Sequence, residues 1–284
     1  MLFERQVDRD YPLFVARADG TEPRRLSPPG LNTNLAYGGA AFSPDGRRVA
    51  FAARPPCSYE ACVDYEIYVT RTDGSGFRQV ASGIDPSWSP DGRFLAYSGA
   101  FGGRNDPYEA FVVSLATEKT WGLGPGRRPV WAPRGRRVAY TSLRGLQALC
   151  SARFDGTARR CVRGADASAI TWSPDAKRVA FQLGFQGRLA VVDATGRGLR
   201  VFPGTQSSPG AWSPDGRRIA FVSGRFGQIR IRSADGASVA RALTREGRGT
   251  EFRDIRWRGG RISYVASLMR NDHGSRCSAP RAQA

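Results

Sequence analysis

A phrase of about eleven residues recurs along the chain at nearly constant spacing. It reads AFSPDGRRVAF at 41–51 and AWSPDGRRIAF at 211–221, and the other copies lie at 87–97, 130–140, 171–181 and, degraded, 256–265. An aromatic residue holds the same place in each: Phe42, Trp88, Trp131, Trp172, Trp212 and Trp257, spaced by 46, 43, 41, 40 and 45 residues. The repeat carries no sustained 3.6-residue periodicity, which excludes a helical solenoid.

Each phrase predicts a β-hairpin. Ser-Pro-Asp-Gly suits a type I turn, because Pro fixes φ at the second position and Gly tolerates positive φ at the last. The turn joins a strand that ends in Trp or Phe to a strand such as Val49–Phe51, whose side chains alternate between two faces. We call this pair the inner hairpin.

A second, outer hairpin accompanies each inner one. The outer hairpins are expected at 11–27, 65–82, 108–123, 146–162, 187–202 and 227–244. Asp-Gly at 73–74, 155–156 and 235–236 indicates tight turns, of two residues or longer. Four strands every 40–46 residues are typical of a propeller blade.

The sequence therefore predicts an all-β, six-bladed β-propeller of four-stranded antiparallel blades over residues 1–268, with a flexible tail at 269–284. The first outer hairpin precedes any inner one, and the last inner hairpin has no outer one after it. We expect the N- and C-terminal strands to close the ring, which removes an open sheet edge. Residues 2–5 form one strand more than this scheme needs, so the closing blade either takes a strand from the other end or has five strands, or residues preceding Met1 are missing.

Composition argues against an enzyme. The one His, His273, lies near the C-terminus, which disfavours Ser-His-Asp hydrolysis and His-rich metal sites, so we expect no metal and no cofactor. No apolar stretch is long enough to span a membrane, and no signal peptide is visible in the chain.

The net charge of +18 has two readings. Of 43 basic residues only Lys119 and Lys177 are Lys, and the Arg residues are spread along the whole chain, which favours a compositional origin. The alternative is an anion-binding surface, which would show as an Arg patch unmatched by carboxylates. No specific nucleic-acid site is expected, because the aromatic residues hold fixed core positions and are unavailable to stack on bases.

Four of the five cysteines form two candidate pairs. Cys150 and Cys161 flank Asp155-Gly156 symmetrically, so a two-residue turn would place their Cα atoms about 5.5 Å apart, within reach of a disulfide. Cys57 and Cys62 lie in one loop and could close a small disulfide ring. Unpaired thiols remain the alternative for both pairs. Disulfides would indicate an oxidising, extracytoplasmic compartment.

Charged residues cluster where the inner strands begin, at the expected mouth of the central channel. They could bind a ligand or cation, or they could merely cap strands and pair with one another. The candidates are Asp85, Arg127, Arg128, Asp166, Glu251 and Asp254.

The SPDG-Arg-Arg-hydrophobic-Ala-Phe phrase, followed by strands such as Ile-Tyr-Val that lead to Asp-Gly, resembles the β-propeller repeat of the TolB family over residues 2–266. The family's N-terminal α/β domain has no counterpart here. The resemblance implies a monomeric, non-catalytic protein of the bacterial cell envelope, periplasmic or secreted, that binds a protein partner or envelope component. The alternative is the propeller domain of an enzyme or a sugar-binding sensor that uses the central channel. The G-x-S-x-G motif of the related peptidases is absent.

Overall fold

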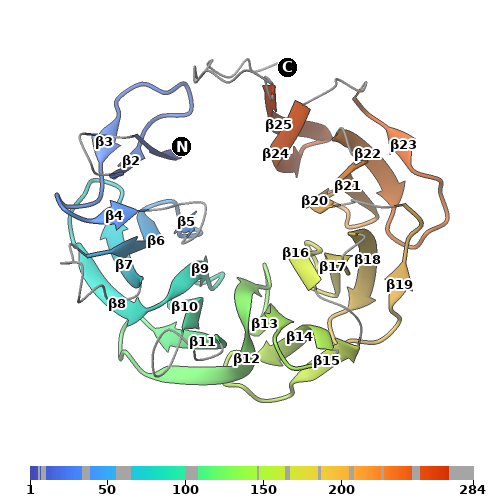
Figure 1. The fold of residues 1–284 in the computed structure, drawn as a ribbon, viewed down its shortest axis with the longest axis horizontal. Coiled ribbons are helices and arrows are strands. Elements are labelled where there is room, and N and C mark those ends of the chain that lie inside the picture. Colours follow the sequence, from blue (N-terminus) through green and yellow to red (C-terminus); the bar gives the residue numbers. More distant parts are fainter. Residues whose placement is uncertain are drawn as a thin grey trace. The chain divides into compact units, whose positions relative to one another are not determined.

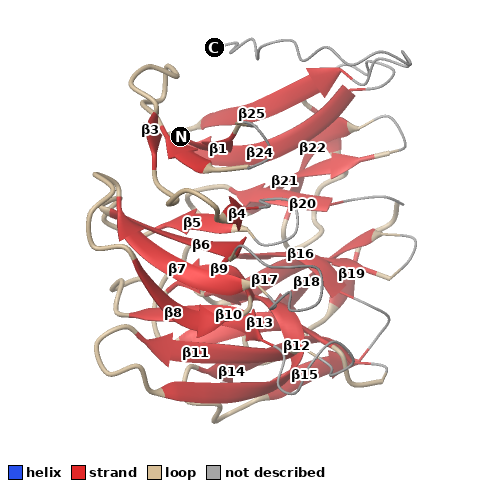
Figure 2. Ribbon diagram, turned by 60° about the vertical axis from the view of Figure 1, so that its left-hand side comes forward, coloured by secondary structure: helices blue, strands red, loops and turns tan. Residues whose placement is uncertain are grey.

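The computed structural model describes most of the repeat region. The described residues are 1–5, 7, 11–33, 39–55, 65–99, 108–145, 147–163, 167–184, 187–204, 208–224, 227–244 and 250–268. Over these residues the regular elements are all strands (Figure 2). No helix in this part of the chain is long and apolar enough to cross a membrane.

The chain divides into two compact units, each described by itself. The first comprises Met1–Gly145 with Ser151–Arg159, and the second comprises Leu146–Cys150 with Arg160–Ala284. Figure 1 labels the strands of both units along the chain. The assignment of residues 1–268 to one domain stays a prediction.

The first unit begins with a three-stranded sheet in the order β1-β2-β3, formed by Leu2–Glu4, Leu13–Val15 and Arg24–Arg25. The next sheet has the order β4-β6-β7-β8, and β5 also pairs with β6; its strands are Asn32–Thr33, Ala40–Phe42, Arg48–Arg54, Glu66–Arg71 and Arg78–Ser82 for β4 to β8. A seven-stranded sheet has the order β15-β14-β13-β12-β11-β10-β9, of which β15 and residues 147–150 of β14 are assigned to the second unit. Its strands β9 to β15 are Ile84–Trp88, Phe94–Gly99, Glu109–Ser114, Thr120–Trp131, Arg137–Ser142, Gln147–Arg153 and Arg160–Arg163.

The second unit holds two four-stranded sheets and a hairpin. Strands β16 to β19 are Ala167–Trp172, Arg178–Leu183, Arg188–Asp193 and Arg200–Val201, paired in chain order. Strands β20 to β23 are Ser208–Trp212, Arg218–Ser223, Gln228–Ser233 and Arg241–Ala242, also paired in chain order. The hairpin joins β24 (Thr250–Arg258) and β25 (Arg261–Leu268).

All six predicted inner hairpins are present as antiparallel pairs. The separation into four-stranded blades is only partly right, because β12 belongs to two repeats at once. It pairs with β11 through its first half and with β13 through its second half. Glycine makes this possible, since Gly124 has a φ of 116° and a Cβ at Gly126 would lie 2.5 Å from the Tyr140 ring.

The extra N-terminal strand has a definite place. β1 pairs with β2 along Leu2–Glu4, and β3 pairs with the other side of β2. Both edges of β2 are therefore filled by strands of the first unit. The expected ring closure would pair the C-terminal hairpin with β2, but β1 already pairs with that edge of β2.

The SPDG turns form as predicted. In the first, the Gly46 amide donates to the Ser43 carbonyl at 2.9 Å, and the Arg48 amide donates to the Ser43 hydroxyl at 2.9 Å. The fourth turn residue has positive φ in every copy from 43 to 216: Gly46 (69°), Gly92 (66°), Gly135 (77°), Ala176 (59°) and Gly216 (69°).

The outer Asp-Gly turns are longer than two residues. At 153–157 the Gly156 amide donates to the Arg153 carbonyl at 2.9 Å, and the Arg153 amide donates to the Thr157 carbonyl at 2.9 Å. This is a three-residue loop with Gly156 in the left-handed region (φ 82°), so the turn is the longer of the two alternatives. The Asp155 carboxylate accepts from the Thr157 amide and hydroxyl, which favours the longer loop.

The repeat aromatics form the core, as predicted. Trp88, Trp131, Trp172 and Trp212 are at most 8% exposed. The aromatics that close the hairpins are equally buried: Phe51, Tyr97, Tyr140, Phe181 and Phe221. Phe42 departs from the pattern at 39% exposure.

Successive repeats are tied together by the second Arg of the phrase. The Arg48 guanidinium lies 4.8 Å from the ring centroid of Trp88 in the next repeat, and its Nη2 donates to the Gly92 carbonyl at 2.7 Å. The Trp88 indole donates back to the Ala41 carbonyl at 2.9 Å. We call this arrangement the Arg–Trp tie.

The Arg–Trp tie recurs in the second unit. Arg178 lies 5.2 Å from the Trp212 ring and donates to the Gly216 carbonyl at 2.7 Å. Arg218 lies 5.2 Å from the Trp257 ring. Part of the chain's Arg content is therefore structural.

Ala176 occupies a turn position that favours glycine, so Ala176→Gly should stabilise the protein. Relief of the left-handed conformation of Ala176 outweighs the entropy that Gly adds to the unfolded chain, for a net gain of about 0.5–1 kcal/mol in the free energy of unfolding. Gly216→Ala is the matched reverse change, because an added Cβ would meet nothing closer than 3.6 Å. It should lower the denaturation midpoint. Equal midpoints for both variants and the wild type would contradict this.

Loss of the Arg–Trp tie should be costly. Arg48→Ala removes a cation–π contact and a charged hydrogen bond and is expected to destabilise by about 1.5–3 kcal/mol. Arg48→Lys keeps the charge but loses the planar stacking, so its free energy of unfolding should lie between those of the wild type and Arg48→Ala. The exposed neighbour Arg47 is the control, since Arg47→Ala should change stability by less than about 0.5 kcal/mol. Equilibrium unfolding in urea measures all three; equal losses for Arg47→Ala and Arg48→Ala would refute the tie.

Candidate functional site

The inner strands share an irregularity just before the aromatic anchor. The pairing register shifts three and two residues before the anchor in β9, β12, β16 and β24, and two residues before it, at Gly210, in β20. The residues at this position include Asp85, Arg128 and Ala169, whose φ values are 58°, 53° and 50°. Such bulges re-aim side chains at strand ends and are frequent beside functional sites. We call this the bulge position.

Two bulge residues of the first unit meet through a buried hydroxyl. The Ser98 hydroxyl donates to Oδ2 of Asp85 at 3.0 Å and accepts from the Arg128 amide at 2.8 Å. Ser98 is fully buried, whereas the Arg128 side chain is exposed. The structure thus joins β9, β10 and β12 around one carboxylate.

The Asp85 carboxylate is held at an energetic cost. Burial raises the pKa of Asp85 above its ordinary 3.8, and the Ser98 hydrogen bond and the charges of Arg128 and Arg127 oppose that rise. A half-buried carboxylate in a left-handed backbone conformation is unfavourable for stability alone. This combination makes Asp85 the strongest functional candidate of the predicted set.

The other predicted residues have mixed outcomes. Asp85 and Arg128 are brought together, and the charge of the exposed Arg127 also reaches Asp85. Glu251 and Asp254 lie on β24, and Asp254 falls at the bulge position. Asp166 lies outside the described residues, as do Cys57 and Cys62.

Ser98 was missed as a site residue. The signal for it was weak, because the residue after the closing aromatic is polar in other repeats too: Ala52 and Val222 are apolar there, but Thr141 and Gln182 are not. A buried hydroxyl indicates a polar partner nearby, but the sequence does not show which of these hydroxyls has one.

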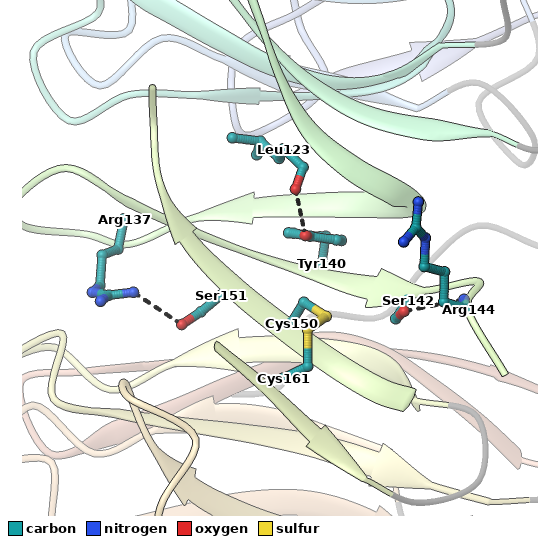
Figure 3. The surroundings of a disulfide bond; sticks show 8 residues. All are labelled: Leu123, Arg137, Tyr140, Ser142, Arg144, Cys150, Ser151 and Cys161. Carbon is teal, nitrogen blue, oxygen red and sulfur yellow. Dashed lines mark hydrogen bonds between the residues drawn. A yellow bond between two sulfur atoms is a disulfide. The ribbon is translucent and has the colours of Figure 1, made fainter. Parts of the chain in front are cut away.

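The disulfide between Cys150 and Cys161 is present, as predicted. It links the neighbouring strands β14 and β15, and the two Cα atoms lie 4.0 Å apart (Figure 3). This is shorter than the expected 5.5 Å and nearer the spacing of a non-hydrogen-bonded pair. Cys150 is buried.

A separate cavity of about 370 Å³ lies in the first unit. Its lining is polar and aromatic: Glu4, Tyr11, Asn32, Thr33, Arg54 and Tyr65. The Arg54 guanidinium lies 4.5 Å from the Tyr65 ring centroid, and Asn32 Oδ1 accepts from the Tyr11 amide at 3.1 Å. The repeat pattern gave no indication of this cavity, because its lining comes from five separate places in the chain.

Comparison with known proteins identifies the fold. No family model matches the chain, and no curated protein matches it. Among solved structures it is similar to TolB from Acinetobacter baumannii, with 21% identity and a TM-score of 0.53, over 87% of this chain and 62% of TolB. The chain thus spans less than two thirds of that protein.

Other solved propellers are equally similar. Oligogalacturonate lyase from Vibrio parahaemolyticus gives a TM-score of 0.63 with 12% identity, over 94% of this chain and 82% of the lyase. The β-propeller domain of the Trilobed protease from Pyrococcus furiosus gives 0.59 with 12% identity, over 78% of this chain and 75% of that chain. The chain therefore has a TolB-like β-propeller fold, which proteins of several activities share.

Removing the charge of Asp85 should stabilise the protein at neutral pH. A raised pKa means that the folded state favours the neutral acid, so the contribution of Asp85 to stability is present below pH 3.8 and is lost as the pH rises through the folded-state pKa. Asp85→Asn mimics the neutral acid and tolerates positive φ. Its melting temperature should exceed that of the wild type at pH 7, and the two should converge below about pH 4.

Asp45 provides a control of opposite sign. The Ser43 hydroxyl lowers the pKa of Asp45, so its stabilising effect is present above pH 3.8 and is lost as the pH falls. Asp45→Asn should therefore melt below the wild type at pH 7. A loss of stability at pH 7 in both variants would show that Asp85 is simply a structural acceptor.

Proposed function

We propose that this chain is a non-catalytic, TolB-like β-propeller that binds a protein partner or ligand through the ends of its inner strands. The observation that carries the proposal is the Asp85–Ser98–Arg128 group. It combines a half-buried carboxylate with an exposed guanidinium, both in left-handed conformations, at one repeat position. Fixed charges of both signs on rigid strands suit selective recognition better than they suit stability.

The proposed ring is monomeric, contains six repeats and closes with strands from both ends. The six inner hairpins support this count. Because β1 and β3 fill both edges of β2, the C-terminal hairpin would have to join through β1. The closing sheet would then hold five strands, one of the arrangements that the sequence allows.

The proposed location is extracytoplasmic, in the bacterial cell envelope. The Cys150–Cys161 disulfide supports an oxidising compartment. The likeness to TolB is compatible with this location, but at 21% identity it concerns the fold. The non-catalytic assignment relies on the sequence, which has one His and no G-x-S-x-G motif.

A second candidate function is a sugar-binding sensor or the propeller domain of an enzyme. The cavity lined by Tyr11, Asn32, Arg54 and Tyr65 favours it, because aromatic faces beside amide and guanidinium donors suit an acidic sugar. The likeness to oligogalacturonate lyase gives the probe to use. Saturable binding of an oligogalacturonide that Arg54→Ala abolishes would favour this function over the first.

The proposed function is tested by quantitative cross-linking in the cell envelope of the native host. Arg128→Asn removes the exposed charge and tolerates the positive φ, and Arg217→Asn is the control at an exposed turn Arg. A partner of the proposed site should be enriched with the wild type and the control, and depleted at least about tenfold with Arg128→Asn. Equal recovery with all three proteins would refute recognition through this group.

A further inference from the structure

Two arginines on β22 lie where a β-propeller repeat normally places apolar side chains. Arg230 is half-buried and Arg232 is only 7% exposed. In the antiparallel register Arg230 is opposite Phe221 and Arg232 is opposite Ile219. Both arginines therefore share the face of the sheet that carries the buried Phe221 and Ile219.

The other repeats show that arginine is not required there. The equivalent residues on β18, opposite Phe181 and Val179, are Ala190 and Val192. On β11, opposite Tyr97 and Leu95, they are Phe111 and Val113. The pair at 230 and 232 is thus a departure confined to one repeat among these three.

The buried parts of both guanidiniums lack partners. Among the described residues that are not exposed, the buried side-chain nitrogens and oxygens without a hydrogen bond are Nε of Arg230 and Nε of Arg232. The Arg232 guanidinium lies 3.6 Å from the centroid of the Phe202 ring. This cation–π contact stabilises the cation, but it offers no acceptor to an N–H that points along the plane of the guanidinium. An unpaired buried donor is costly, and a charged one more so.

A third arginine adds to the unbalanced charge. Nη1 of Arg200 and the Phe202 ring edge lie 2.9 and 3.4 Å from where a Cβ of Gly236 would stand, so these groups adjoin one another. Burial, and then the charge of Arg200, lowers the pKa of Arg232. The carboxylate found to interact with Arg200 is Asp235, which already accepts from the Ala237 amide at 2.9 Å.

We propose that Arg200, Arg230 and Arg232 form a binding site for a phosphate group beside Phe202. Guanidinium groups bind tetrahedral oxyanions through paired N–H donors. Arg230 and Arg232 are two residues apart on one strand, about 6.6–6.8 Å along it, so one phosphate can lie between their side chains. The apolar Phe202 ring beside Arg232 and Arg200 lowers the local dielectric and strengthens the interaction.

The direct test is titration calorimetry with inorganic phosphate, in chloride buffer of matched ionic strength. We expect saturable binding with a Kd at or below about 1 mM for the wild type. Arg232→Val and Arg230→Ala introduce the residues that β18 carries, and each should weaken binding at least tenfold. Arg217→Ala, at an exposed turn Arg of the same sheet, should bind like the wild type. Phenyl phosphate in a parallel titration separates the sources: tighter binding than phosphate indicates a phosphomonoester, and equal binding indicates free phosphate.

Thermal melting gives an independent readout that a structural role would not produce. Without phosphate, Arg232→Val should melt at the same temperature as the wild type or above it, because an unpaired buried charge has been removed. Phosphate should raise the melting temperature of the wild type but not that of the variant. Absence of saturable binding by the wild type, or equal binding by Arg230→Ala and the wild type, would overturn the proposal even if Arg232→Val failed to fold.

Discussion

The Arg–Trp tie joins neighbouring repeats at three places in the described structure. A hairpin repeat buries one face against the next repeat, and the tie adds a specific contact to that apolar packing. The Arg48 guanidinium does this for Trp88 and Gly92, and the Trp88 indole returns a hydrogen bond to Ala41. Arg48 thus combines a stacking contact with Trp88 and a charged hydrogen bond to Gly92, which makes the tie directional as well as apolar.

The Arg–Trp tie gives part of the chain's positive charge a structural role. Arg48, Arg178 and Arg218 each lie over an indole, so their positive charges serve packing as well as solubility. Arg230 and Arg232 differ from these three, because their buried Nε atoms have no hydrogen-bond partner. The equivalent residues on β18 are Ala190 and Val192.

The bulge position shows how the repeats can carry different residues while keeping the same backbone fold. The backbone irregularity recurs in five inner strands, while the residue it presents differs: Asp85, Arg128, Ala169 and Asp254 are among them. Since the bulge leaves the residue outside the regular pairing, its identity can vary while the rest of the hairpin keeps its register. Asp85 combines partial burial, a raised pKa and a left-handed backbone.

The sequence alone determined the repeat, its hairpins and its core. The SPDG phrase encodes its own turn, since Pro44 and Gly46 set the backbone and Ser43 caps it, and the period places Trp88 and Phe51 in the core. The Cys150–Cys161 pair followed from local spacing as well. Each of these features depends on residues close together in the chain.

Only the tertiary structure decided which residues of different repeats meet. It joined Asp85 to Arg128 through Ser98, merged two repeats through β12 and gave β1 the free edge of β2. It also built the cavity at Tyr65 and buried Arg232 against Phe202. The physical reason is that a repeat pattern specifies the average environment of a position, whereas these contacts depend on bulges and on the particular side chains of the neighbouring repeat.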